Sequence, residues 1–183
     1  TLSADCRNGI DCMTTETTCW SSIWQTDGVT EEYLAGHGRA DAYKELKPAD
    51  VAYYDGCIEL DLSKIECMIA LPMHPSYAYP IRELKANAKD LLHEIETRAN
   101  EQLSGKVKMD LVSKVRADGS IYVDQGIVAG CSGGTYENLC AVADILRGKS
   151  CGNGEFKFSV YPDSMPTYLE LVKNGAVADI VSA

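Results

Sequence analysis

Residues 127–148 predict a buried strand, a glycine-rich loop that carries a cysteine, and an amphipathic helix, in that order. The short apolar run at 127–129 is typical of a buried strand. Glycines at 130, 133 and 134 then give the backbone access to angles that other residues avoid. Thr135 is a suitable N-cap for the helix, and Gly148 is a suitable C-terminal stop. The apolar face between these two ends consists of Tyr136, Leu139, Cys140, Ala143 and Leu146.

Cys131 lies inside this glycine loop, just before the predicted helix. Helix N-termini stabilise negative charge, and the thiolate is the form of cysteine that binds metal ions or attacks carbon. Its position therefore makes Cys131 a candidate metal ligand or nucleophile. The alternative is a small residue packed into a tight turn, as free cysteines commonly are.

The composition limits the class of protein. With 183 residues, 45% of them hydrophobic, the chain can bury a core of one domain, with room for an additional segment. A net charge of −10 argues against nucleic acid and anionic membrane surfaces as partners. No apolar stretch approaches the roughly 18 residues that a membrane span needs. The first residue is Thr1, which we interpret as a sign of a processed, truncated or excised segment, although removal of an initiator Met gives the same start.

The cysteines predict a reduced, cytoplasmic protein. None forms a C-x-x-C pair, which argues against a self-contained zinc ribbon or redox dithiol. They are also too sparse for a disulfide scaffold in a chain of this size. The eight are Cys6, Cys12, Cys19, Cys57, Cys67, Cys131, Cys140 and Cys151.

Strands mixed with long amphipathic helices predict an α/β fold. Residues 1–28 read as irregular, and Asp118-Gly119 as a tight turn between two strands. Ser164 is a suitable N-cap for a helix that Gly175 ends. The predicted helices cover 29–39, about 80–102, 135–147 and 165–174, and the predicted strands cover 57–62, 67–72, 107–115, 120–130, 155–162 and 176–181.

The order of three segments resembles the third domain of the aconitase superfamily of iron–sulfur hydro-lyases. They are YDGCIELDLSKIECMIALPMHPS (54–76), IVAGCSGGTYENLCAVADILRG (127–148) and FSVYPDSMPTYLELVKNGAVADI (158–180). The family motif G-S-C-T-N-x-x-Y-E-[DN] supplies the first cysteine ligand of a [4Fe–4S] cluster, and the matching residues here are Cys131, Tyr136, Glu137 and Asn138, with Gly130 just before the cysteine. The resemblance implies a three-layer α/β/α fold with a mixed sheet, and Cys131 as a cluster ligand.

The upstream stretch CMTTETTCWSSIWQTDGVTEEYLAGHGR (12–39) is similar to the family segment N-M-G-A-E-x-G-A-T-x-S, which also ends in Y-L-x-x-x-G-R. Alignment on Tyr33-Leu34 places Glu16 on the acidic residue that the family uses in its active site, and so implies a catalytic role for Glu16. Cys12 falls where many members carry Asn. The alternative for Glu16 is a solvated loop carboxylate.

Three departures from the family pattern bear on function. Ser132-Gly133 replaces the Thr-Asn pair after the cysteine, and none of the three histidines sits in a His-Asp pair of the family's kind. The C-G-P-C motif that carries the other two cluster cysteines is absent. Because a cluster needs three or four cysteine ligands, we expect this fragment alone to lack a cluster and to be inactive. The resemblance assigns residues 1–47 to the end of a preceding domain plus linker, and 48–183 to a domain-3-like unit truncated before C-G-P-C.

The leading hypothesis is a fragment of a [4Fe–4S] hydro-lyase that reversibly dehydrates a hydroxy-carboxylic acid. The implied partners are that small molecule and the remaining domains of the same enzyme, with no nucleic acid and no membrane. A stand-alone binding or assembly module with this fold and no catalysis is the alternative. A third hypothesis, an unrelated enzyme with Cys131 as nucleophile, lacks a clear partner base.

Overall fold

The computed structural model describes residues 1–152, 154 and 156–183. The chain divides into two compact units: Thr1–Asp55 with Gln125–Ala183, and Gly56–Asp124. The first unit contains the Cys131 loop and the second contains the long amphipathic helix. None of the described helices is both long and apolar enough to cross a bilayer.

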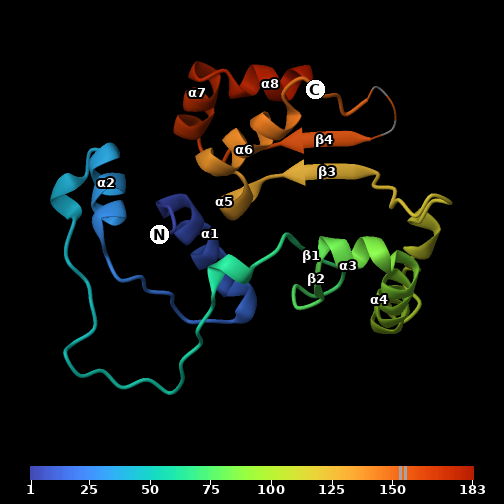
Figure 1. Ribbon diagram of the computed structural model, residues 1–183, viewed down its shortest axis with the longest axis horizontal. Coiled ribbons are helices and arrows are strands. Elements are labelled where there is room, and N and C mark those ends of the chain that lie inside the picture. The colour runs from blue at the N-terminus through green and yellow to red at the C-terminus, as the bar shows by residue number, and fades with distance from the viewer. Residues whose placement is uncertain (153, 155) are drawn as a thin grey trace. The chain divides into compact units, whose positions relative to one another are not determined.

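The centre of the first unit is a parallel pair of strands with helices packed on it (Figure 1). Strand β3 (Gln125–Val128) pairs with β4 (Lys157–Val160), with Gln125 opposite Lys157 and Val128 opposite Val160. Helices α5 (Gly130–Gly133) and α6 (Tyr136–Leu146) follow β3, and α7 (Met165–Lys173) and α8 (Ala176–Ser182) follow β4. Their shared core consists of Leu139, Ala143, Leu171 and Ala176, with Val128 and Val160 packed against it.

The N-terminal part of this unit adds α1 (Ala4–Thr14), the 3₁₀ turns η1 (Thr15–Thr17) and η2 (Ala40–Ala42), and α2 (Gly28–Gly36). Arg7 of α1 donates two hydrogen bonds to the Asp27 carboxylate, at 2.9 and 2.7 Å. Asp27 also caps α2, because its carboxylate accepts the backbone N–H of Thr30 at 3.2 Å. One ion pair therefore ties the start of α2 to α1.

The second unit packs one long helix against a short hairpin and a loop. Strands β1 (Met68–Ala70) and β2 (Ala78–Pro80) are antiparallel, and α3 (Ile81–Ala86) and α4 (Ala88–Leu103) follow them. Short 3₁₀ turns are η3 (Leu62–Lys64) and η4 (Val112–Lys114). The core consists of Leu71, Leu84, Leu92 and Ile95.

The predicted α/β class is confirmed, with parallel and antiparallel pairing present in two separate two-stranded sheets of the described chain. Helices α2, α6 and α7 form as predicted, and Ser164 caps α7 by accepting the N–H of Thr167 at 3.3 Å. The turn at Asp118-Gly119 is present, since Arg116 N–H donates to Ser120 O at 2.8 Å. The predicted strand at 155–162 is β4; residue 155 lies outside the described residues.

Four predictions about the elements were wrong, and the fourth of them covers two segments. Residues 1–28 are not irregular throughout, because Ser3 caps α1 by accepting the N–H of Cys6. Residues 176–181 form helix α8 and not a strand, and Val177 and Ile180 contact the core of the first unit at helical spacing. The helix at 80–102 is interrupted at Asn87, which separates α3 from α4.

The fourth error concerns strands predicted in the second unit. Residues 57–62 lie outside the described strands, and Ile58 is 96% exposed. Segment 107–115 is a loop whose backbone bonds to side chains of α4. Glu96 accepts the N–H groups of Leu111 and Val112 at 2.7 and 3.0 Å, and Asn100 bonds both backbone groups of Met109. These side chains take the place of a neighbouring strand.

Candidate functional site

Cys131 lies at the carboxyl end of β3, where the chain turns into helix. Gly130 has a φ of +85°, a left-handed conformation that suits glycine. The loop predicted here is a single helical turn, α5, closed by a 2.8 Å hydrogen bond from Gly134 N–H to Gly130 O. Helix α6 then begins after Thr135, as predicted. The Cys131 side chain is exposed on this turn.

Gly134 holds this turn against the segment that follows β4. Asp163 N–H donates to Gly134 O at 2.9 Å, and Tyr161 N–H donates to Val128 O at 2.9 Å. A Cβ atom at Gly134 would lie only 2.5 Å from Tyr161 O. Two connections at the carboxyl edge of the parallel strands therefore touch backbone to backbone, and only glycine fits at the contact. This edge is where α/β sheets commonly place their sites.

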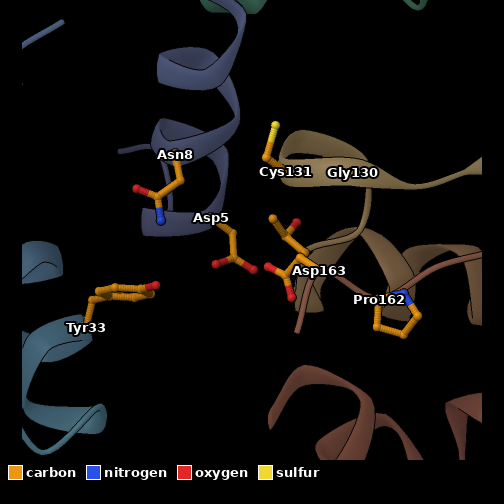
Figure 2. Close-up of a pocket in the computed structure, with 8 residues that line it drawn as sticks. Asp5, Asn8, Tyr33, Gly130, Cys131, Pro162 and Asp163 are labelled. Atoms are coloured by element: carbon orange, nitrogen blue, oxygen red, sulfur yellow. The ribbon is translucent and has the colours of Figure 1, made fainter. Parts of the chain in front are cut away.

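A cavity of about 380 Å³ opens beside Cys131. Figure 2 shows Asp5 of α1 and Asp163 of the segment after β4 directed into the same space, with Tyr33 of α2 across from them. Two carboxyl groups therefore line the cavity beside the Cys131 thiol, an oxygen and sulfur donor set of the kind that metal ions bind. The lining residues are Asp5, Asn8, Tyr33, Gly130, Cys131, Thr135, Pro162 and Asp163.

Helix α1 forms one wall of this cavity because it is bonded to the start of α6. Ser3 Oγ donates to Glu137 Oε2 at 2.5 Å, and Glu137 N–H donates to Asp5 Oδ2 at 3.1 Å. Closer to Cys131, a Cβ atom added at Gly9 would lie 3.6 Å from the Cβ of Ser132. Helices α1 and α5 therefore pack in direct contact.

Cys12 is brought to Cys131 by this packing. The half-buried Cys12 lies on α1 one helical turn after Gly9, the residue that packs against Ser132. Hydrogen bonding to Cys131 raises the pKa of the Cys12 thiol, and burial and the neighbouring Cys131 and Asp11 charges add to the effect. Sequence reasoning placed Cys12 only on a position where the family carries Asn. The spacing of Gly9 and Cys12, three residues apart on one helix, is the signal that could have put both on the face toward α5.

Thr135 supplies an unsatisfied polar atom at the cavity wall. The residue is 5% exposed, and its Oγ1 is buried with no hydrogen-bond partner among the described residues. It occupies the predicted N-cap position, but its hydroxyl makes no capping bond. A buried hydroxyl without a partner costs about 1–3 kcal/mol, so its presence here points to a group that the cavity would hold.

These residues fit one attachment point of an iron–sulfur cluster. Cys131 would hold the cluster through its exposed thiol, and the buried Thr135 hydroxyl, which has no partner among the described residues, would be a hydrogen-bond donor beside it. Within the described chain, no group of three or more His, Cys, Asp or Glu side chains is arranged to hold a metal ion.

Glu16 lies apart from this cavity in the structure. It is an exposed residue of η1, four positions after Cys12, and it is not among the residues that line the cavity. Its predicted catalytic role stays a prediction. The histidines make local contacts: His37 Nδ1 lies 2.7 Å from Tyr33 O, and His74 Nδ1 lies 2.7 Å from Ser76 Oγ.

Comparison with known proteins relates the whole chain to one family. The profile of the aconitase family (aconitate hydratase) matches residues 1–183. The 3-isopropylmalate dehydratase large subunit of Clostridium beijerinckii is 26% identical over 182 residues, covering 100% of this chain and 35% of that protein. The 2,3-dimethylmalate dehydratase large subunit of Eubacterium barkeri is also 26% identical over 182 residues, with the same coverage of each chain. The chain thus spans about a third of the length of these curated relatives.

Proposed function

The chain belongs to the aconitase family, and from this premise we propose that it forms part of an iron–sulfur hydro-lyase. The reaction is the reversible loss of water from a small hydroxy-carboxylic acid. The observation that carries the proposal is the exposed Cys131 thiol on a cavity that also contains the buried, unpartnered Thr135 hydroxyl. The names of the relatives, which are dehydratases, support the reaction class.

We propose Cys131 as a ligand to one iron of a [4Fe–4S] cluster. When bound, such a cluster supplies a Lewis acid that stabilises hydroxide as a leaving group. The chain's own residues would position the ligand and set the polarity of the cavity. Thr135 would donate a hydrogen bond into the cavity, and Asp5 and Asp163 would add carboxyl groups to its wall. Gly130 allows the left-handed turn before the thiol, and Gly134 allows the close backbone contact with the segment after β4 that holds the turn. Glu16 is proposed as an active-site acid on the family alignment alone.

The substrate class follows from the relatives. Two of them are named for malates that carry alkyl substituents, 3-isopropylmalate and 2,3-dimethylmalate. We propose an alkyl-substituted malate as the substrate of the complete enzyme. Since one thiol of this chain matches a cluster ligand, we propose that the 183 residues alone are inactive and need the remaining domains of the enzyme. A cytoplasmic location agrees with eight free cysteines.

The ligand assignment can be tested on the chain itself. A synthetic [4Fe–4S] cluster with small alkyl-thiolate ligands, added anaerobically at one equivalent per chain, can exchange a ligand for a protein thiolate. Alkylation of the remaining free thiols and peptide mass spectrometry then identify the protected cysteine. We expect protection at Cys131 and free alkylation at Cys57, an exposed cysteine of the second unit that serves as internal control.

Two variants sharpen this test. Cys131→Ser should lose most of the iron retained after gel filtration, whereas Cys57→Ser should retain it. Thr135→Val keeps the shape of the side chain and removes the hydroxyl, so it should weaken retention without unfolding the chain. Protection spread evenly over the exposed cysteines would refute Cys131 as the cluster ligand and favour the non-catalytic binding module.

The reaction itself requires more chain. A chimera in which these 183 residues replace the aligned segment of the C. beijerinckii large subunit can be assayed for dehydration of alkyl malates by the ultraviolet absorbance of the unsaturated product. Activity that depends on Cys131 supports the hydro-lyase. A chimera that folds and binds iron but is inactive toward every alkyl malate tested would refute the proposed substrate class.

A further inference from the structure

Two thiols from distant parts of the sequence meet beside the cavity. Cys12 comes from the last turn of α1, and Cys131 from the α5 turn after β3. Helix α1 packs on the α5 turn, where a Cβ atom added at Gly9 would lie 3.6 Å from the Cβ of Ser132, and this packing places Cys12 beside Cys131. Cys131 is exposed and Cys12 is half-buried.

The supporting backbone is fixed on both sides of the pair. Gly9, one helical turn before Cys12, packs against Ser132, the neighbour of Cys131. The start of α1 is bonded to Glu137 through Ser3 and Asp5. The two thiols therefore belong to elements that pack against each other.

Two other cysteines have side-chain sulfur atoms in contact with residues other than Cys131. Cys140 Sγ receives a hydrogen bond from Asn174 Nδ2 at 3.4 Å, and Cys19 Sγ lies 3.2 Å from Thr17 Oγ1. Cys57 and Cys67 belong to the second unit. Cys12 follows Gly9 by one helical turn, so it is the cysteine of α1 that lies toward the end of the helix beyond the contact with Ser132.

We propose that Cys12 and Cys131 form a reversible disulfide under oxidising conditions, a modification site that closes when the cavity holds no iron. The disulfide itself depends only on the geometry of this chain. Its consequence, that Cys131 is withdrawn from iron while the bond lasts, rests on the function proposed above. The disulfide would also protect the Cys131 sulfur from irreversible oxidation.

The chemistry balances with hydrogen peroxide as oxidant. The exposed Cys131 thiolate attacks one peroxide oxygen; the S–O bond forms, the O–O bond breaks, and hydroxide leaves to become water. This gives a sulfenic acid at Cys131. The Cys12 sulfur then attacks that sulfur, forming the S–S bond and releasing the second oxygen as water. The two sulfurs together lose two electrons, which the peroxide gains, and a dithiol reductant reverses the change.

The test is a peptide map of the 183-residue chain without iron. The chain is treated with peroxide, its remaining free thiols are alkylated, and it is digested without reductant. We expect a linked peptide pair containing Cys12 and Cys131, lost on treatment with dithiothreitol. In Cys12→Ser, Cys131 should instead be trapped by a sulfenic-acid reagent and should proceed to the sulfinic acid. Cys19→Ser, the matched control on the same segment, should form the bond as the unaltered chain does.

Several outcomes would overturn the proposal. One is a map in which Cys131 is linked to a different cysteine, and another is oxidation of Cys131 to sulfinic acid at the same rate with and without Cys12. The readout contains no iron, so it is independent of cluster binding. Formation of the disulfide together with failure of cluster transfer would keep this proposal and refute the cluster, and the reverse result would do the opposite.

Discussion

The Gly134→Ala substitution tests whether the Cys131 turn is held in place by backbone contact. The added Cβ would meet three backbone atoms: Tyr161 O at 2.5 Å, Gly130 O at 2.9 Å and Asp163 N at 3.0 Å. Ordinary van der Waals contact begins near 3.4 Å, so the closest approach is about 0.9 Å too short. Because all three neighbours are backbone atoms, no side chain can rotate away to relieve the clash.

The size of the effect follows from these contacts. Overpacking of this kind costs about 1–3 kcal/mol. Moving the segments apart also strains the hydrogen bonds from Asp163 N–H to Gly134 O and from Gly134 N–H to Gly130 O, each worth about 1 kcal/mol. We expect Gly134→Ala to lower the free energy of unfolding of the first unit by about 2–4 kcal/mol.

Gly133→Ala is the matched control, since the nearest atom to its added Cβ is Val128 Cγ1 at an ordinary 3.9 Å. Alanine there reduces the entropy of the unfolded chain, so this variant should be unchanged or more stable by up to about 1 kcal/mol. The two variants should differ by about 3 kcal/mol, more than 100-fold in the unfolding equilibrium.

Urea unfolding followed by circular dichroism measures this difference, and hydrogen exchange of residues 136–146 assigns it to the first unit. Equal unfolding midpoints for Gly133→Ala and Gly134→Ala would refute the close approach of the two connections. A loss of protection in α4 as large as that in α6 would refute the division into two units.

Three further predictions concern the supports of the site. Leu139→Ala should destabilise the first unit by about 2–5 kcal/mol in urea unfolding because Leu139 is 0% exposed, whereas Leu169→Ala, at a side chain 49% exposed, should cost under about 0.5 kcal/mol; equal effects would contradict the assigned core. The hydrogen bonds from Arg7 lower the pKa of Asp27 from 3.8 to about 2, so the stabilisation from this pair is complete above pH 3.8 and is lost as the pH falls toward 2. Between pH 3.8 and 2, the urea midpoint of Asp27→Asn should therefore fall less than that of the unaltered chain. Glu16→Gln should leave the unfolding midpoint unchanged because Glu16 is exposed, but should reduce turnover in the chimera; unchanged turnover would remove Glu16 from the proposed active site.

Local sequence signals predicted the helices whose first and last residues are marked by capping or stop residues. Helix α6 has an N-cap residue, one apolar face and a glycine stop within a short stretch, and α7 has Ser164, Pro166 and Gly175 in the expected places. These signals act between neighbouring residues, so no tertiary contact is needed to recognise them.

Segments whose structure depends on distant partners could not be predicted in this way. Residues 107–115 have the alternation of a strand, yet Glu96 and Asn100 of α4 occupy their backbone groups. Residues 176–181 are apolar enough for a strand, but the surface left open by α6 and α7 accepts them as helix α8. In both cases the choice between strand and another structure is made by packing rather than by local propensity.

The residues of the candidate site show the same difference between local signals and contacts that depend on the fold. The glycine pattern pointed to Cys131, because a strand that ends in glycines before a helix is a local feature. The unpartnered hydroxyl of Thr135 could not be foreseen, because the sequence identifies a capping position but not whether its side chain makes the capping bond. The contact of Cys12 with Cys131 depends on α1 packing against α5, which only the fold determines.

The departures from the family pattern lie around Cys131, whereas a motif residue that supports the Cys131 turn is retained. Ser132-Gly133 and Cys12 replace residues that the family pattern gives as Thr-Asn and Asn, and Ser132 and Cys12 contact elements next to the Cys131 thiol. Glu137, by contrast, matches the family motif, and it makes the bonds to α1 that support the turn. The Cys12 thiol stands where the family pattern gives the amide of Asn, close to Cys131. This replacement changes the environment of whatever Cys131 binds. A Cys12→Asn variant therefore separates the two proposals: it restores the family residue for cluster transfer and removes the partner for the disulfide.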